Sequence, residues 1–315
     1  MTIRVYAAQI TLLLLFAAPS CAVAWTYPLP GEGDSVVGSL DIVNVAEGEV
    51  LVDIARTHNV GFEAIHIANP EIDTWLPAPG SEVLIPRQFV LPDAPREGIV
   101  VNVAEMRLYY FPPARAGQPR VVVTHPVSIG RGDWETPRAV TRITRKAVNP
   151  TWTPPESVRI EHLERGDPPL PAVVPPGRDN PLGRHALYLD LPSYLLHGTN
   201  RPYGIGMRVT HGCIRLYPED VSRLYDSVPV GTRVNIIYQP AKAGRLGNRV
   251  YLEVHPPYSE LGPQPVQDVS PAVEAVERLV DAGLAEDQVD WDAVRDAGAI
   301  ANGLPVVVSS VRLGR

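Results

Sequence analysis

The stretch GIVVNVAEMRLYYF, residues 98–111, decides the fold class of the largest part of this chain. Two runs of mostly β-branched and aromatic residues, 99–103 and 107–111, stand on either side of the short break Ala-Glu-Met. Such residues favour strands, and two runs separated by a short break are typical of a β-hairpin. The sequence therefore predicts an antiparallel hairpin at this point.

Strand-like runs recur after the hairpin, at residues 120–129, 141–146, 186–191, 194–199 and 233–238. One helix is predicted among them, at 218–228, because a proline and two acids in its first turn precede an amphipathic spacing. Since the strands follow one another without βαβ alternation, we predict a mainly β domain, a sandwich or barrel and not a parallel sheet, with its site on loops at one edge. The proline-rich stretch 150–181 is predicted to form loops.

The first 24 residues have the order of a secretory signal peptide: an arginine, an apolar run at 10–19 and small residues at 22–24. We expect cleavage before Trp25 and a soluble exported protein, because the apolar run is shorter than the roughly 20 residues that a membrane span needs. A lipoprotein-type cleavage before Cys21 is the alternative, which the preceding proline and serine disfavour.

Composition sets further bounds on the function. The 315 residues carry a net charge of −7 and are 45% hydrophobic, which fits a globular chain of about two domains. The acidic balance does not suggest a nucleic-acid partner. The sequence also contains no dinucleotide fingerprint, and we predict no cofactor.

Cys213 is the candidate reactive residue, because loss of the signal peptide would leave it as the sole cysteine. A single thiol excludes an intramolecular disulfide, and the histidines show no metal-ligand spacing, so we predict no metal site. A nucleophile or a buried structural residue remains. A nucleophilic thiol needs a base or a positive charge nearby, and His197, His211 and Arg215 are near in sequence. No acid adjoins either histidine in sequence, so a backbone carbonyl is expected to orient the imidazole.

A small unit precedes the β domain, at residues 41–87. Its pattern predicts a strand at 42–45, two helices starting near 50 and 61, and a strand at 82–86. This βααβ unit resembles the LysM module, through Val-x-x-Gly-Glu at 45–49, the Asn-Pro pair at 69–70 and the closing Leu-Ile-Pro at 84–86. The resemblance implies binding to N-acetylglucosamine-containing glycans such as peptidoglycan. A structural cap without a ligand is the alternative.

The central domain also resembles a known family. His-Gly-Thr at 197–199, followed by Thr-His-Gly-Cys-Ile-Arg-Leu at 210–216, is similar to the catalytic motif of the L,D-transpeptidases, the YkuD-type domains. The resemblance extends over residues 98–239 and, with the signal peptide and the LysM-like unit, points to the periplasmic Gram-negative members. One position departs from the pattern, because Ala139 stands where a Thr-Pro-x-Gly motif would have glycine.

The resemblance implies a reaction and its main residues. Cys213 would attack the carbonyl between the third residue and the terminal D-alanine of a peptidoglycan tetrapeptide stem. His197 would be the general base, oriented by a backbone carbonyl near Gly198. The thioester would then pass to an amine of a second stem peptide, forming a 3-3 cross-link, or to a lysine of an anchored protein such as an outer-membrane lipoprotein.

The resemblance also implies supporting roles. His211 would help to hold the site, and the backbone N–H groups of Gly212 and Cys213 would stabilise the oxyanion. Arg215 would bind a substrate carboxylate or pin the loop. The predicted substrate-binding residues are Gly198, Thr199, Tyr203 and Thr210. Release of the acyl group to water, as in an L,D-carboxypeptidase, and a catalytically inert glycan-binding wall protein are the alternatives.

Residues 240–315 are predicted to form an α/β appendage. A strand at 249–255, a helix that begins at Ser270 and is closed by Gly283, and a final strand near 304–311 are expected. We expect this appendage to pack on the β domain, and the sequence assigns it no role.

Overall fold

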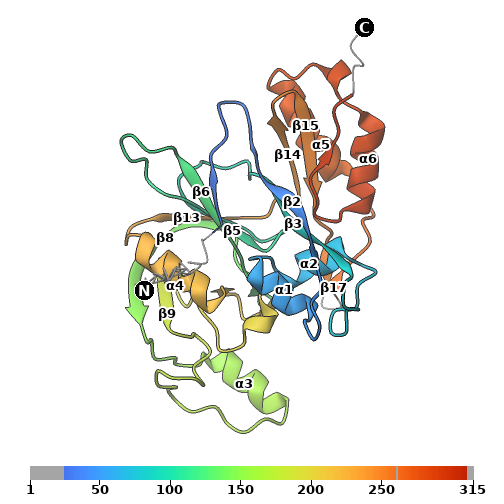
Figure 1. Cartoon of the computed structure of the whole chain (residues 1–315). Coiled ribbons are helices and arrows are strands. Elements are labelled where there is room, and N and C mark those ends of the chain that lie inside the picture. The colour runs from blue at the N-terminus through green and yellow to red at the C-terminus, as the bar shows by residue number, and fades with distance from the viewer. Residues whose placement is uncertain (1–24, 260–261, 311–315) are drawn as a thin grey trace, which may run out of the picture.

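The computed structural model describes residues 25–259 and 262–310, and its largest element is a nine-stranded sheet (Figure 1). The signal peptide predicted at 1–24, with Cys21, lies outside the described residues. The sheet has the order β1 (Thr26–Pro28), β6 (Val121–Pro126), β5 (Arg107–Phe111), β4 (Gly98–Asn102), β13 (Arg233–Ile237), β8 (Ala139–Val148), β9 (His185–Leu189), β10 (Leu195–His197) and β12 (Ile214–Arg215).

The predicted hairpin is present as β4 and β5, with Ile99 opposite Tyr110 and Asn102 opposite Arg107. The sheet is mixed and mostly antiparallel. β13 pairs with β4 in parallel, and β12 pairs with β10 in parallel. Both parallel pairs join strands that are separated by a long connection, as parallel pairing requires. The prediction of a mainly β domain is confirmed.

A backbone bridge draws the two ends of the sheet together. Ser128, two residues beyond β6, pairs with Arg215 in β12 through two hydrogen bonds of 2.8 and 2.9 Å. Since β6 lies near one edge of the sheet and β12 forms the other, this bridge curls the sheet toward a barrel.

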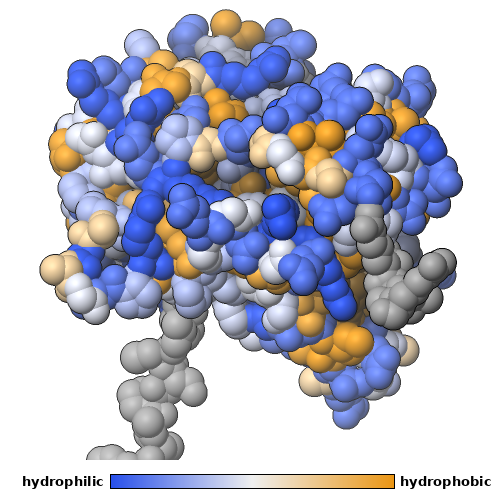
Figure 2. All heavy atoms as spheres, turned by 90° about the horizontal axis from the view of Figure 1, so that it is seen from above, coloured by the Kyte–Doolittle hydropathy of each residue, from blue (hydrophilic) through white to orange (hydrophobic). Residues whose placement is uncertain are grey.

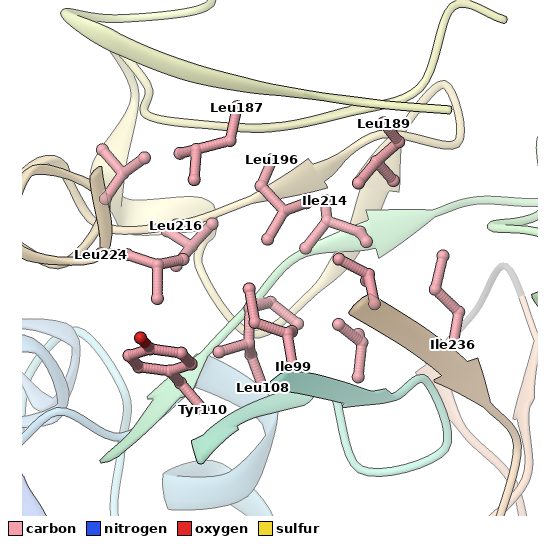
Figure 3. Close-up of a cluster of buried hydrophobic side chains, with 14 of the residues drawn as sticks. Ile99, Leu108, Tyr110, Leu187, Leu189, Leu196, Ile214, Leu216, Leu224 and Ile236 are labelled. Atoms are coloured by element: carbon pink, nitrogen blue, oxygen red, sulfur yellow. The ribbon is translucent and has the colours of Figure 1, made fainter. Parts of the chain in front are cut away.

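The interior of the curl holds the main hydrophobic core. Leu108, Leu187, Leu196 and Ile214 point into it from four strands (Figure 3). The predicted helix is α4 (Pro218–Ser227), which covers the core with its apolar face, including the buried Leu224. Burial of such aliphatic side chains is the main stabilising contribution to this domain.

A second helix, α3 (Glu156–Glu164), corrects the prediction of one helix and of loops throughout residues 150–181. The helix follows Pro155, which ends the preceding extended segment, and Gly166 with φ +78° follows it. Val158 is the buried residue of this helix, and the spacing of its apolar residues gives no stripe along one face that periodicity could detect.

The N-terminal unit consists of β2 (Val36–Asn44), α1 (Leu51–Thr57), α2 (Phe62–Ala68) and β3 (Glu82–Val90). Its order is the predicted βααβ, but both strands are longer than expected. The additional ends carry Val37 and Phe89, which pack with Tyr109 of the main sheet. The added length of the two strands therefore brings the N-terminal unit into contact with the main sheet.

The C-terminal unit contains the sheet β14 (Ala241–Leu246), β15 (Arg249–Val254) and β18 (Val306–Val307), covered by α5 (Ser270–Asp281) and α6 (Trp291–Ile300) (Figure 1). The predicted helix and strands are present, and β14 and α6 were not predicted. Short elements complete the fold: β7 (Ile129–Gly130), β11 (Arg208–Thr210), β16 (Tyr258–Ser259), β17 (Gly262–Pro263), and the 3-10 turns η1 (Pro202–Gly204) and η2 (Glu286–Gln288).

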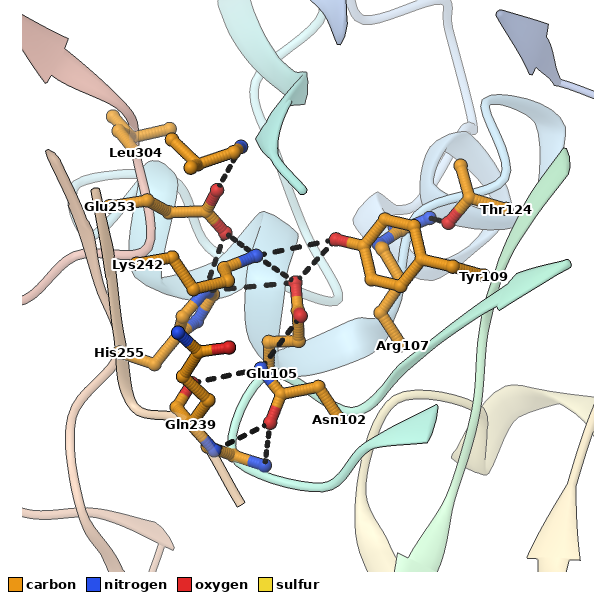
Figure 4. Close-up of polar contacts among 12 residues, drawn as sticks. Asn102, Glu105, Arg107, Tyr109, Thr124, Gln239, Lys242, Glu253, His255 and Leu304 are labelled. Atoms are coloured by element: carbon orange, nitrogen blue, oxygen red, sulfur yellow. Dashed lines mark hydrogen bonds and ion pairs between the residues drawn. The ribbon is translucent and has the colours of Figure 1, made fainter. Parts of the chain in front are cut away.

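A buried polar cluster joins this unit to the rest of the chain (Figure 4). The ammonium of Lys242 lies 2.7 Å from the carboxylate of Glu105 and 2.9 Å from that of Glu253. Tyr109 donates to Glu105 at 2.7 Å, and His255 Nε2 lies 2.7 Å from Glu253. Lys242 and Glu253 come from the C-terminal unit, and Glu105 and Tyr109 from the predicted hairpin.

The face of the molecule shown in Figure 2 is largely hydrophilic, with hydrophobic residues in small groups. Among the described residues, no helix has both the length and the apolar character needed to cross a membrane.

Candidate active site

The parallel pairing of β10 and β12 places His197 beside Arg215 in register. The preceding pair in the ladder, Leu196 and Ile214, points into the main core. Side chains alternate along strands, so His197 and Arg215 lie on the opposite face. Cys213 comes two residues before Arg215, and it packs on that same face with Leu195 and neighbouring residues.

Cys213 is the free cysteine of the described chain, and its thiol is held at the margin of the surface. Its Sγ lies 3.4 Å from the carbonyl oxygen of Ser193. Burial raises the pKa of the thiol above its ordinary value, although a backbone hydrogen bond from Leu195 and the charge of Arg215 act in the opposite direction. The resting residue is therefore a neutral thiol that needs a base.

His197 is 3% exposed, and its Nδ1 lies 2.6 Å from the carbonyl oxygen of Gly198. A carbonyl oxygen only accepts hydrogen bonds, so Nδ1 carries the hydrogen and Nε2 keeps its lone pair. Burial, together with the charge of Arg215, lowers the pKa of His197 to about 3 despite the bond to Gly198. The imidazole is consequently neutral and has one basic nitrogen available.

Arg215 is a largely buried cation beside these two groups. Burial lowers the pKa of its guanidinium. Its Nε atom is buried, and among the described residues it has no hydrogen-bond partner. A buried guanidinium with an unused donor can accept a carboxylate or a developing negative charge.

The turn before Cys213 depends on a glycine. Gly212 has φ +94°, and a Cβ atom on it would lie 2.8 Å from the ring of Tyr194. Its carbonyl accepts a 2.8 Å hydrogen bond from the hydroxyl of Thr136. Within the described chain, the N–H groups of Gly212 and Cys213 donate no hydrogen bond, so both are free to bind an oxyanion.

Thr210 is buried, and its hydroxyl donates to the carbonyl of Cys213 at 2.6 Å. This bond braces the turn, and a direct substrate contact by Thr210 stays a prediction. Thr199 is buried too, and its hydroxyl accepts a hydrogen bond from the N–H of Arg201 at 2.8 Å. Tyr203 is 57% exposed on η1, and Gly198 is packed closely beneath Val221.

His211 has an acidic partner that is distant in sequence, so the expectation that a backbone carbonyl orients the imidazole is wrong for this histidine. Glu161 of α3 binds His211 Nε2 and also accepts from Arg131. Burial would raise the pKa of Glu161, but the hydrogen bonds from His211 and Arg131 lower it overall. A guanidinium nitrogen of Arg131 also lies 3.3 Å from His211 Nε2. The rings of Trp134 and His211 pack edge to face, with their centroids 4.9 Å apart.

Sequence reasoning missed Glu161, Arg131, Thr136 and Ser193 as parts of this site. Glu161 lies 50 positions before His211, on a helix without an amphipathic pattern, and no local signal relates the two. Ala139, the departure from the family pattern, is the first residue of β8 and pairs with Ile236, in a position where a side chain is accepted.

One other cluster has the donor types of a metal site. Within residues 25–259 and 262–310, Glu105, Glu253 and His255 could converge on a cation. The ammonium of Lys242 already lies between the two carboxylates. The donor set is therefore satisfied by the protein, and it does not fit a metal.

A thiol, a neutral imidazole with a free nitrogen, and two free backbone donors are the groups that nucleophilic acyl transfer requires. Residues 96–236 match the family model of the L,D-transpeptidase catalytic domain, YkuD. The chain belongs to the L,D-transpeptidase family.

Three relatives from Escherichia coli K12 are similar over nearly the whole chain. The protein named "Probable L,D-transpeptidase YcfS" is 44% identical over 91% of this chain and 89% of its own. "Probable L,D-transpeptidase ErfK/SrfK" is 43% identical over 94% of both chains. "Probable L,D-transpeptidase YbiS" is 41% identical over 91% of this chain and 93% of its own. The chain is therefore an enzyme of this family, of the Gram-negative type.

Proposed function

We propose that the protein is a cysteine-dependent L,D-transpeptidase that acts on the tetrapeptide stems of peptidoglycan. The observation that carries this proposal is the placement of Cys213 on one sheet face with a neutral, oriented His197. Membership of the L,D-transpeptidase family supports the substrate class.

The first half-reaction forms a thioester. His197 Nε2 takes the thiol proton as Cys213 Sγ attacks the carbonyl carbon of the third stem residue. The oxyanion that forms is bound by the N–H groups of Gly212 and Cys213, and the tetrahedral intermediate collapses with cleavage of the amide bond. His197 returns its proton to the departing amine, and D-alanine leaves.

The second half-reaction transfers the acyl group to an acceptor amine. His197 removes a proton from the amine as it attacks the thioester, and the thiolate leaves and is protonated. An amine of a neighbouring stem gives a 3-3 cross-link, and a lysine of an outer-membrane lipoprotein gives an attached protein. Arg215, with its unused buried donor, is suited to hold a substrate carboxylate at this stage.

The accessory units fit this proposal. A LysM-like N-terminal unit would hold the enzyme on glycan strands, and a signal peptide would deliver it to the periplasm. Support for the first comes from the observed βααβ order of the unit, and for the second from the residue order of 1–24.

Intact-protein mass spectrometry tests the proposal. The chain from Trp25 onward is incubated with a carbapenem and, separately, with muropeptides that carry tetrapeptide stems. An adduct on Cys213 together with dimers joined between third residues supports the transpeptidase. An adduct with tripeptide product alone favours hydrolysis or a missing protein acceptor. The absence of any adduct or product contradicts the proposal and favours an inert glycan-binding protein.

A further inference from the structure

The N-terminal unit is hydrogen-bonded to the chain segment that connects the candidate base to the candidate nucleophile. Residues 198–212 lead from His197 to Cys213, and η1 lies within them. The backbone N–H of Phe62 donates to the carbonyl of Ile205 at 2.8 Å, and that of Glu63 donates to the carbonyl of Gly206 at 3.3 Å. These two N–H groups belong to the first turn of α2, where a helix has no partner of its own for them.

Gly61 and Gly206 allow the backbones of the N-terminal unit and the connecting segment to approach each other closely. A Cβ atom on Gly61 would lie 2.8 Å from the Cα of Gly206, and one on Gly206 would lie 2.3 Å from the Cα of Gly61. Gly61 has φ −80° and ψ 156°, which any residue adopts. Its lack of a side chain is thus required by the contact, and not by the conformation of the unit itself.

The same unit also holds the segment that follows the nucleophile. Arg56 of α1 binds Glu219 of α4 with two hydrogen bonds of 2.8 and 2.9 Å. Asn59 donates to the fully buried carboxylate of Asp220 at 2.5 Å. In Figure 1, α1 and α2 lie beside α4 and the segment that precedes it.

We propose that the N-terminal unit is a positioning element of the active site, in addition to any role as a glycan anchor. The unit fixes residues 200–207 and the start of α4, and with them the placement of Cys213 against His197. This inference rests on the proposed function for its kinetic test, and on the partial burial of Cys213 for a second test that is independent of it.

Gly61→Ser separates docking from folding of the unit. Serine is favoured at a helix N-cap, the position that Gly61 occupies, so α2 itself is preserved. The new Cβ would press the unit away from Gly206. Gly31→Ser is the matched control, because Gly31 has an ordinary φ and nothing lies within 4 Å of its Cβ position.

The donor for the kinetic test is a tetrapeptide stem without a glycan, which a glycan anchor cannot help to bind. We expect kcat of Gly61→Ser to fall about tenfold or more, since misplacement of reacting groups by about 1 Å can cost roughly 100-fold, while circular dichroism stays unchanged. Gly31→Ser should retain the wild-type kcat. A wild-type kcat in Gly61→Ser contradicts the proposal.

Charge exchange gives a second test that does not depend on the glycine. Arg56→Glu should lower kcat on the same donor, and Arg56→Glu combined with Glu219→Arg should restore part of it. If the double variant is as slow as the single one, or if the single one is not slowed, the ion pair has no positioning role.

Alkylation of Cys213 by iodoacetamide keeps the inference testable even if the wild type transfers no acyl group. Loosened packing should expose the thiol and speed its alkylation severalfold in Gly61→Ser but not in Gly31→Ser. Equal rates in all three proteins would overturn the inference, whereas a wild type without turnover or adduct counts against the proposed function alone.

Discussion

The Nδ1 atom of His197 lies 2.6 Å from the carbonyl oxygen of Gly198, its own neighbour in the chain. A peptide carbonyl therefore takes the place that a carboxylate has in a Ser-His-Asp triad. It orients the ring and selects the tautomer, but it supplies no negative charge to stabilise an imidazolium. Burial and the charge of Arg215 lower the pKa of His197 to about 3, although the hydrogen bond to Gly198 acts in the opposite direction.

His197→Asn tests the role of the free imidazole nitrogen. The asparagine amide can still donate to the carbonyl of Gly198, while the basic Nε2 is removed. We expect the rate of Cys213 acylation by a carbapenem to fall by about 100- to 10,000-fold, as general-base removal typically costs. Stopped-flow fluorescence or mass spectrometry measures the rate, and an unchanged far-UV spectrum verifies the fold. An acylation rate near that of the wild type would exclude His197 as the base.

The pH dependence of thiol reactivity follows from the two pKa shifts. Because burial raises the pKa of Cys213, alkylation by iodoacetamide should still increase with pH above about pH 9, where the rate for ordinary thiols levels off. Because the pKa of His197 is lowered to about 3, it gains no proton near neutrality. A plot of the carbapenem acylation rate against pH should accordingly show no inflection from protonation of His197 between about pH 5 and 7. An inflection there that disappears in His197→Asn would contradict the neutral imidazole.

Glu161→Gln tests the contact between α3 and His211. Glutamine keeps the shape of the side chain but loses the charge that binds His211 and Arg131. We expect kcat/KM for the tetrapeptide donor to fall by about tenfold, the equivalent of one charge-assisted hydrogen bond. Glu164→Gln, an exposed change on the same helix, is the control and should have no effect. If the two variants have equal kcat/KM values, the contact of Glu161 with His211 does not contribute to activity.

Lys242→Met tests the buried cluster that joins the C-terminal unit to the sheet. The ammonium is 0% exposed and lies between two carboxylates, so its removal leaves uncompensated buried charge. We expect the free energy of unfolding in urea to fall by about 3–5 kcal/mol. Adding Glu105→Gln and Glu253→Gln should recover part of that loss. A single variant as stable as the wild type would show that the cluster is not held by this charge.

The parts of the fold that local patterns determine could be predicted from the sequence. The hairpin of β4 and β5 and helix α4 follow from strand propensity and apolar spacing within about a dozen residues. Cys213 could be singled out because it is the sole cysteine after the predicted signal peptide. Its neighbours His197 and Arg215 were named because they are close in sequence.

The remaining parts depend on residues that are far apart in the chain. Glu161 meets His211 across 50 positions, and Lys242 meets Glu105 across 137. The sequence around these residues does not reveal either pairing. Each polar side chain could equally be a solvated surface residue, and only the folded structure shows its distant partner. Gly61 is a similar case, because its backbone is ordinary and only the approach of Gly206 explains it.

The bridge between Ser128 and Arg215 has a consequence for how this protein associates with others. β12 is two residues long and forms one edge of the sheet, so its outer side would otherwise present unpaired backbone groups. Ser128 occupies both the N–H and the carbonyl of Arg215 on that side. An incoming strand therefore finds no template there, and the end of the sheet that carries the thiol is protected against edge-to-edge aggregation.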